Sequence, residues 1–446
     1  MGQGEVSRVR NEPGPNEPTT YATAVGTVRS WPDDLDDLDA YEQAPDAAPA
    51  PRRRRRAAPF FIVCRVLMGL LSATALAAMS IVYLRVDQLE DSKNTTDAVS
   101  VAQSGEQASA PDDDANDILI VGNDSRTDMQ GNPLSEELLK ELRTEATSTL
   151  NTDTLILLRI PRDGGRGAAI SIPRDTSVKV PGLDKEEKIN GAFGITKALT
   201  EQKLVDRGET DRRTIARKSD DAGRTALIKT VQRLTGVRVD HYTEVSLYGF
   251  YLLTEVIDGV DVCLNNSTSD PDSGASFAAG PQTVRGGDAV AFVRQRKNLP
   301  RGDLDRIVRQ QTFLASAMNK VLSGDLLTNN AKLDALEDAV SKTIVMDGGL
   351  HFLELVGQAQ ALASGRVRFV TIPVTGVGAR NDRGQSIITV DVKAVHRYVR
   401  SLVTGRPQAP PPPATPSTAP STAKLTGATL LDLNAAGGRA AVPCVD

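Results

Sequence analysis

The sequence predicts an α/β domain over residues 117–404, preceded by a single transmembrane helix. Short apolar runs bounded by glycine or polar turn residues alternate here with longer segments of helical periodicity, and this alternation is typical of α/β folds. The 446 residues, 40% of them hydrophobic, are enough to bury a large core. A 19-residue run without a charged side chain at 66–84 predicts the membrane helix.

The apolar run at 66–84 nearly crosses a hydrocarbon core of about 30 Å at a rise of about 1.5 Å per residue, and residues 60–63 lengthen it. Five consecutive arginines at 52–56 precede it, which places the N-terminus in the cytoplasm. A cleavable signal peptide is the alternative, but the run is long and begins far into the chain. We therefore expect a single-pass protein of the cell membrane whose chain after residue 84 is extracytoplasmic.

The flanking segments differ from the domain in composition. Residues 1–59 are rich in acidic residues, proline and alanine and end in the arginine run, which indicates a disordered cytoplasmic tail. After the membrane helix at 60–84, the polar segment 85–116 is expected to be an extracytoplasmic stalk. Residues 405–446 are predicted to be a Pro-rich linker with a short C-terminal tail.

Within the domain, hydrophobic patterning predicts the order of the elements. We expect strands at 117–122, 154–160, 168–172, 241–245, 260–264 and 367–373. Helices are expected at 135–144, from about 188, and at 222–234, 247–259, 303–322, 326–346 and 350–363. The highly charged segment 201–221 is predicted to be an exposed insertion.

Cysteine and histidine usage excludes some kinds of site. The three histidines are isolated and no CxxC pair occurs, so a zinc or histidine-based site is not expected. Cys64 lies at the cytoplasmic edge of the predicted membrane helix, where thiols stay reduced. Cys263 and Cys444 both fall on the oxidising side, and we predict a disulfide between them, with two free thiols as the alternative.

Residues 290–311 contain the most informative motif, with five arginines among apolar residues. Arg294 and Arg296 are expected on one face of a strand end or extended turn. Arg306, Arg309 and Gln310 are expected on one face of a helix that begins at Asp303. The planar fork of donors on arginine suits phosphate, so this stretch favours a phosphate site over the alternative of a solvated basic surface.

Aspartates beside arginines occur at two predicted strand ends. Asp124 and Arg126 follow one strand, and Arg174 and Asp175 follow another, where ligands of open α/β sheets bind. Asp153 precedes its strand, so it joins them only if that strand is antiparallel to the others. Carboxylates next to arginines are expected where Mg²⁺ bridges carboxylate and phosphate oxygens. Turn or cap formation is the alternative role for Asp124 and Asp153.

The ordered set of motifs resembles the LytR-CpsA-Psr family. These motifs are GNDSR (122–126), NTDTLILLRI (151–160), SIPRD (171–175), KING (188–191), LTGVRVDHY (234–242), DGVDV (258–262), AFVRQR (291–296) and GDLDRIVRQQ (302–311). The resemblance covers about 117–320 and is specific in combination. It implies a mixed sheet covered by helices in three layers, with an apolar tunnel for a lipid tail. It also implies a phosphotransferase that moves a glycopolymer from a polyprenyl-pyrophosphate carrier onto peptidoglycan.

The resemblance also implies roles for single residues. Asp124 and Asp153 would hold Mg²⁺. Arg126, Arg174, Arg294, Arg296, Arg306, Arg309 and Gln310 would bind or border the pyrophosphate, and Asp303 would orient them. Arg174, Arg296 and Arg306 would act in catalysis, and Asp175 is the expected proton acceptor. Two insertions, at 127–150 and 201–221, depart from the family pattern without touching a motif.

The implied partners are the polyprenyl-pyrophosphate-linked glycopolymer, the peptidoglycan acceptor and the membrane, with no nucleic acid. Two other classes stay open. The same residues would serve a hydrolase that only cleaves the lipid pyrophosphate. The five arginines at 52–56 favour a non-enzymatic regulator or nucleic-acid-binding protein, but the adjacent membrane span places the folded domain away from DNA.

Overall fold

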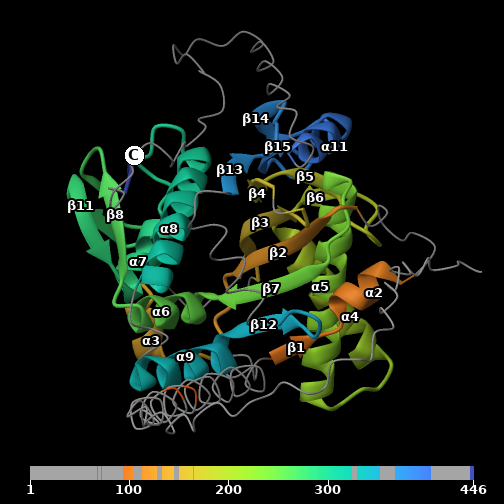
Figure 1. Ribbon diagram of the computed structural model, residues 1–446. Helices are drawn as coiled ribbons and strands as arrows, with labels where there is room; N and C mark the ends of the chain where they lie inside the picture. Colours follow the sequence, from red (N-terminus) through yellow and green to blue (C-terminus); the bar gives the residue numbers. More distant parts are fainter. Residues whose placement is uncertain are drawn as a thin grey trace, which may run out of the picture. The chain divides into compact units, whose positions relative to one another are not determined.

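A seven-stranded mixed sheet is the centre of the part of the chain that the computed structural model describes (Figure 1). The described residues are 68, 72, 94–104, 113–127, 133–144, 150–163, 165–323, 329–351, 367–402 and 442–446. The strand order is β1 (Asn94–Thr96), β12 (Ile344–Asp347), β7 (His241–Ser246), β2 (Ala115–Asn123), β3 (Thr152–Pro161), β4 (Gly167–Ser171) and β13 (Val367–Thr371). β3 is antiparallel to β2 and β4, whereas β2 pairs with β7 and β4 with β13 in parallel. The predicted α/β class and the mixed sheet are confirmed.

Both faces of the sheet are covered, which explains why its central strands read as continuous apolar runs. Leu155 and Leu157 pack into one cluster with α4 (Gly191–Asp206) and α5 (Arg212–Thr235). Ile156 and Leu158 point to the opposite face, where they pack with residues of α8 (Asp303–Ser323). The alternation along β3 follows the two-residue period of a strand. α2 (Ala98–Gln103) and α11 (Val392–Ser401) complete the first layer.

A second, smaller sheet lies on the far side of α8, as Figure 1 shows. It consists of β11 (Gly280–Val284), β8 (Val260–Leu264) and β16 (Cys444–Val445). Phe313 and Ala317 of α8 pack against it, while Ala315 of the same helix packs against the central sheet. α8 is therefore buried between two sheets, and this fixes the position of its first turn.

The remaining described elements are short. The helices are α3 (Glu136–Glu141), α6 (Leu247–Val256), α7 (Gly286–Arg294) and α9 (Asn330–Thr343). The paired strands are β5 (Ser177–Lys179) with β6 (Glu186–Lys188), β9 (Thr268–Asp270) with β10 (Ala275–Phe277), and β14 (Gly376–Arg380) with β15 (Ser386–Thr389).

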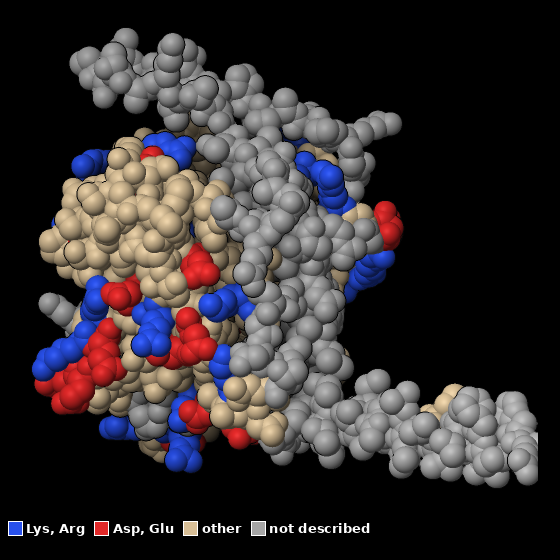
Figure 2. All heavy atoms as spheres, turned by 60° about the vertical axis from the view of Figure 1, so that its left-hand side comes forward, with Lys and Arg blue, Asp and Glu red and all other residues tan. Residues whose placement is uncertain are grey.

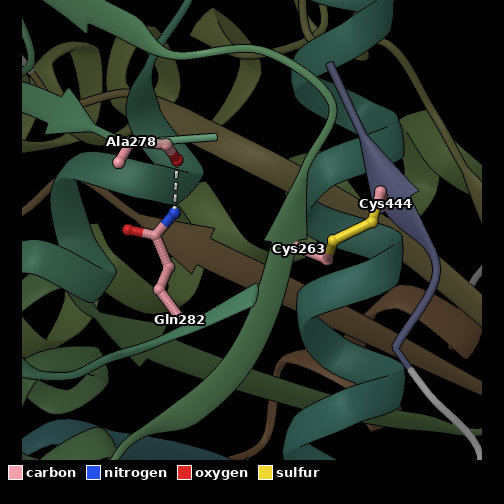
Figure 3. The surroundings of a disulfide bond; sticks show 4 residues. All are labelled: Cys263, Ala278, Gln282 and Cys444. Atoms are coloured by element: carbon pink, nitrogen blue, oxygen red, sulfur yellow. Dashed lines mark hydrogen bonds between the residues drawn. A yellow bond between two sulfur atoms is a disulfide. The ribbon is translucent and has the colours of Figure 1, made fainter. Parts of the chain in front are cut away.

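The disulfide between Cys263 and Cys444 is present and confirms the prediction from cysteine placement. Figure 3 shows it joining β8 to β16, two strands that run parallel with these residues as direct neighbours. The backbone N–H of Asn265 donates to the carbonyl of Val445 at 2.9 Å, which extends the pairing. The bond thus attaches the chain after the Pro-rich linker to the edge of the domain.

Four sequence-based expectations require correction in whole or in part. Residues 201–221 are mostly exposed, as expected, but they are no separate insertion. They end α4 and begin α5, which pack side by side, and Asp211 caps α5 by accepting from the Thr214 N–H at 3.0 Å. The segment before Arg294 is helix α7 and no strand, because its apolar residues are buried on helical faces. The predicted helix 326–346 ends at Thr343, and β12 follows it. Part of the predicted stalk is folded, since β1 pairs with β12 and α2 packs on α5.

The predicted membrane helix at 60–84 lies outside the described residues except for Met68 and Ser72. The predicted tail at 1–59, the linker after 405 up to residue 441 and most of the helix at 350–363 also lie outside them. Within the described ranges, no helix is long and apolar enough to cross a bilayer.

On the face in Figure 2, acidic and basic side chains of the described residues lie intermixed.

Candidate functional site

The start of β3 lies beside the ends of β2 and β4 because β3 runs antiparallel to both. The N–H of Asp124, just after β2, donates to the carbonyl of Asn151 at 3.0 Å. The β2–β3 register then shifts, pairing Asn123 with Thr152 and Gly122 with Thr154, so Asp153 is the extra residue of a bulge. β3 therefore has the antiparallel orientation that the predicted role of Asp153 requires. As a result, Asp153 lies at the same sheet edge as the loops after β2 and β4.

Arg174, in the loop after β4, gathers three carboxylates around one guanidinium. Its Nη1 lies 2.7 Å from Asp153 Oδ1, and its Nε lies 3.5 Å from Asp303 Oδ1 and 3.9 Å from Asp175 Oδ2. Burial lowers the pKa of Arg174, but the charges of Asp153, Asp303 and Asp175 outweigh burial and raise it. This arginine is thus held ionised and in one orientation.

Arg306, from the first turn of α8, reaches the same carboxylates with only 2% of its side chain exposed. Its Nη2 lies 2.9 Å from Asp303 Oδ1 and donates to the main-chain carbonyl of Asp153 at 3.3 Å. Burial lowers the pKa of Arg306 despite the nearby Asp303. Among the described residues, no acceptor takes a hydrogen bond from the buried Nε of Arg174 or of Arg306. Two guanidinium N–H groups therefore lack an acceptor, and an anion would supply one.

A second aspartate–arginine pair lies on the neighbouring strand end. Arg126 Nη2 donates to Asp124 Oδ2 at 3.0 Å, and Arg126 Nη1 donates to the main-chain carbonyl of Asp124 at 2.9 Å. Arg294, the last residue of α7, lies in the field of both pairs: Asp124 and Asp153 raise its pKa, Arg126 and Arg174 lower it. Burial is the largest effect, and the net pKa of Arg294 is lowered.

Arg294 is the least compensated of these cations. Its Nη1 donates to the main-chain carbonyl of Arg143 at 3.3 Å. Within the described residues it forms no ion pair, so its charge is opposed only at a distance. Arg294 thus adds a positive charge near Asp124 and Asp153 at this sheet edge.

Three residues of the arginine-rich stretch are placed differently from the expectation. Arg309 does not share a ligand-facing surface with Arg306: its Nε donates to the Asp446 carbonyl at 2.6 Å and its Nη1 to Gln295 Oε1 at 2.7 Å. Gln310 donates to the Val293 carbonyl at 3.1 Å near the end of α7. The side chain of Arg296 is exposed, and its backbone N–H donates to Asp270 Oδ2 at 3.1 Å. The guanidinium groups that meet are those of Arg174 and Arg306, with Arg126 and Arg294 beside them.

Asp124 and Asp153 are the carboxylates that the sequence assigns to a metal, and Asp175 and Asp303 lie near them around Arg174. No group of three or more histidine, cysteine or acidic side chains in the described ranges is placed to hold a metal ion. Magnesium is commonly held by one or two carboxylates together with substrate phosphates, so this donor set fits Mg²⁺ only with a phosphate ligand present. Each carboxylate is paired with an arginine, and a bound cation would have to share it.

Sequence reasoning missed two sets of residues that position the site. Lys188 Nζ lies 2.8 Å from Asp175 Oδ1 and fixes that carboxylate. Behind β2, Glu244 accepts from Asn123 Nδ2 at 2.8 Å, from Arg224 Nε at 2.9 Å and from the Tyr242 hydroxyl at 2.8 Å. Lys188 belongs to the KING motif and Tyr242 to the LTGVRVDHY motif. No local pattern shows that Lys188 meets Asp175, 13 residues away, or that Arg224 meets Glu244, 20 residues away.

Comparison with known proteins shows the family of this chain. The model of the LytR_cpsA_psr family matches residues 81–402. The cell wall biosynthesis protein LcpA of Corynebacterium glutamicum is 42% identical over 369 residues, 82% of this chain and 70% of LcpA. The probable cell wall biosynthesis protein LcpB of the same organism is 30% identical over 72% of this chain and 68% of LcpB.

More distant matches carry a more specific name. A protein of Bacillus mycoides named polyisoprenyl-teichoic acid–peptidoglycan teichoic acid transferase TagU is 27% identical over 231 residues, 50% of this chain and 60% of TagU. The crystal structure of B. subtilis TagV matches 66% of this chain and 98% of its own, with 20% identity and a TM-score of 0.46.

Proposed function

This chain belongs to the LytR-CpsA-Psr family, and we propose that it is a phosphotransferase that moves a glycopolymer from a polyprenyl-pyrophosphate carrier onto peptidoglycan. The single observation that carries the proposal is the pair of buried guanidiniums, Arg174 and Arg306, whose Nε atoms have no protein acceptor among the described residues. Their planar forks match the oxygens of a diphosphate. The names of the relatives support a polymer donor and a peptidoglycan acceptor.

The reaction follows from how charge develops on a diphosphate. A peptidoglycan sugar hydroxyl attacks the phosphorus that carries the glycopolymer, forming a new P–O bond. The bond from that phosphorus to the bridging oxygen breaks, and polyprenyl phosphate leaves. Arg174, Arg306 and Arg294 offset the negative charge on the non-bridging and leaving oxygens, which is the largest contribution that a protein makes to such a transfer.

Asp175 is the proposed acceptor of the hydroxyl proton. It adjoins Arg174, and Lys188 at 2.8 Å holds one of its oxygens in place. A positioned carboxylate within hydrogen-bond reach of the nucleophile is what general-base catalysis requires. Mg²⁺, held by Asp124 and Asp153 together with phosphate oxygens, would supply further neutralisation of the diphosphate charge.

Membrane anchoring belongs to the same proposal and rests on the sequence. The uncharged run at 66–84 after five arginines places the domain on the outer side of the membrane, where both carrier headgroup and peptidoglycan are accessible. Protease added to intact cells with a permeable wall should then degrade the domain after residue 117 and spare the N-terminal tail. Protection of the domain would contradict this topology.

The test of the transferase is reconstitution of the full chain with a labelled polyprenyl-pyrophosphate-linked glycopolymer and peptidoglycan. Label should enter peptidoglycan in a Mg²⁺-dependent way, with polyprenyl phosphate as the second product. Asp124→Ala and Asp153→Ala variants that remain folded should lose this Mg²⁺-dependent transfer. Release of polyprenyl phosphate without incorporation of label would identify a hydrolase instead.

A further inference from the structure

A polar pocket of about 530 Å³ adjoins the arginine–aspartate cluster. It lies between the first half of α4, strand β6 and the turn that joins β14 to β15. The residues that matter for its chemistry are Asn151, Lys188, Asn190, Lys197, Glu201 and Gln385.

The pocket and the cluster share a wall. Lys188 lines the pocket and binds Asp175 Oδ1 at 2.8 Å. Asn190 lines the pocket, and its N–H donates to the carbonyl of Arg174 at 3.1 Å. Asn151, also in the lining, accepts from the N–H of Asp124 at 3.0 Å. A ligand in the pocket would therefore lie next to both loops that hold the proposed reaction centre.

The charges around the pocket are paired within the protein. Lys197 Nζ lies 2.6 Å from Asp220 Oδ1 and 3.7 Å from Glu201 Oε1. Glu187 and Arg383 form an ion pair across the pocket rim. Little net charge is left to attract an anion or a cation.

What the lining offers instead is hydrogen-bonding capacity. Asn151, Asn190 and Gln385 among the lining residues carry side-chain amides with both donors and acceptors, and Gln385 Oε1 also accepts from Asn381 Nδ2 at 2.8 Å. Such a lining suits an uncharged polyhydroxyl ligand and disfavours a prenyl chain, which needs apolar walls. A sugar is the ligand class that fits.

We propose that this pocket binds the peptidoglycan sugar that accepts the transferred group, an assignment that rests on the proposed transferase function. Asp175 connects the acceptor pocket to the donor site, because it contacts both the pocket residue Lys188 and the diphosphate-binding Arg174. A hydroxyl entering from the pocket meets Asp175 on its way to the phosphorus held by Arg174 and Arg306. The hydroxyl proton passes to Asp175 as the new P–O bond forms and polyprenyl phosphate departs.

The test fills the pocket without touching the cluster. Ala198 and the adjacent Leu199 are both exposed on α4, but Ala198 lines the pocket and Leu199 does not. Ala198→Trp should lower transfer to peptidoglycan fragments by about tenfold or more, a cost of about 1.4 kcal/mol. The Kd for the polyprenyl-pyrophosphate-linked donor should stay within about twofold of that of the parent. Leu199→Trp, the matched control, should change neither quantity.

A milder variant keeps the test valid if tryptophan disturbs α4. Gln385→Ala should raise KM for the peptidoglycan fragment while leaving kcat and the donor Kd near the parent values. Unchanged transfer in both folded variants, or weakened donor binding in parallel with lost transfer, would overturn the acceptor assignment alone. No transfer by the parent protein, with donor and acceptor both supplied, would overturn the proposed function and this inference with it.

Discussion

Buried arginines in two parts of this domain differ in how their charges are compensated. The charge of Arg224 is compensated within the protein: its Nε donates to Glu244 Oε2 at 2.9 Å, and its Nη1 lies 3.3 Å from Asp221 Oδ1. Burial lowers the pKa of Arg224, but Glu244 outweighs it and the pKa is raised. Arg306 is buried somewhat more deeply, and its pKa is lowered because burial outweighs Asp303.

The difference shows where a ligand is needed. A buried ion pair with full hydrogen bonding holds the surrounding chain in one arrangement, and here the Arg224–Glu244 pair fixes Asn123 next to the site. Arg306 is also paired, with Asp303, but its buried Nε–H has no acceptor among the described residues, so its desolvation is only partly compensated. Such a residue in a cluster with perturbed pKa values is a candidate for binding or catalysis. The two groups should therefore respond to substitution in opposite ways.

Replacement of Arg224 should have the largest effect, and on stability. Arg224→Met leaves Glu244 buried without its cation, so the free energy of unfolding should fall by about 3–5 kcal/mol. Urea denaturation measures it. Arg213→Met, an exposed position on the same helix, should stay within about 0.5 kcal/mol of the parent. A loss below about 1 kcal/mol for Arg224→Met would mean that the two groups do not differ as described.

Replacement of Arg306 should act on turnover. Arg306→Lys keeps the charge but loses the fork of donors, and transfer should fall by about 100- to 1,000-fold, as when one transition-state donor is removed. Its unfolding free energy should change less than that of Arg224→Met. Arg301→Lys tests the same substitution at a half-exposed position paired with Asp305, and it should transfer nearly as fast as the parent. Full activity in Arg306→Lys would show that the arginines act only as diffuse charge.

The sequence predicts many of the elements that form the site, because these elements depend on patterns within short stretches of chain. The strands ending at Asn123 and Ser171, the helix start at Asp303 and the disulfide between Cys263 and Cys444 all follow from residue pattern or compartment. The sequence also shows that Asp153 precedes its strand, so it can join the site only if that strand is antiparallel to its neighbours. The structure supplies that direction for β3.

The parts that failed depend on distant contacts. The spacing of Arg306 and Arg309 places both on one helix face, but α8 lies between two sheets and Arg309 contacts Gln295 and Asp446 instead. The charged segment 201–221 is mostly exposed, as its composition predicts, but its polar residues conceal that it belongs to the packed helices α4 and α5. The strand pairing of residues 94–96 with β12 joins segments 250 residues apart, beyond any local pattern.

Another buried arginine, Arg309, contacts the segment that the disulfide holds. Its Nε donates to the carbonyl of Asp446, two residues after Cys444, at 2.6 Å. The double substitution Cys263→Ser with Cys444→Ser should lower the unfolding free energy by about 2–4 kcal/mol, since it frees a long loop in the unfolded chain and loosens the partner of Arg309. Parent protein with and without reductant provides the control. Equal stability of parent and variant under oxidising conditions would show that the bond does not stabilise the domain.

The smallest expected effect tests whether Arg174 and Arg306 form a binding site for an anion. Asp303 lies between Arg174, at 3.5 Å, and Arg306, at 2.9 Å, and neither of its buried oxygens has hydrogen-bond geometry to them. If Asp303 competes with the ligand for these guanidiniums, Asp303→Asn should tighten binding of inorganic pyrophosphate by up to about tenfold, about 1.4 kcal/mol. Calorimetric titration at fixed ionic strength measures the change.

Asp305→Asn removes the same charge from the same helix turn, but Asp305 pairs with Arg301 and not with the site, so it should change pyrophosphate binding by less than about twofold. This control separates local competition from the general loss of a negative charge. If Asp303→Asn instead weakens pyrophosphate binding as strongly as Arg306→Lys does, Asp303 orients the arginines and does not compete for them. The charge of Arg306 would then be compensated within the protein, as the charge of Arg224 is by Glu244. The proposed difference between the two buried arginines would be wrong.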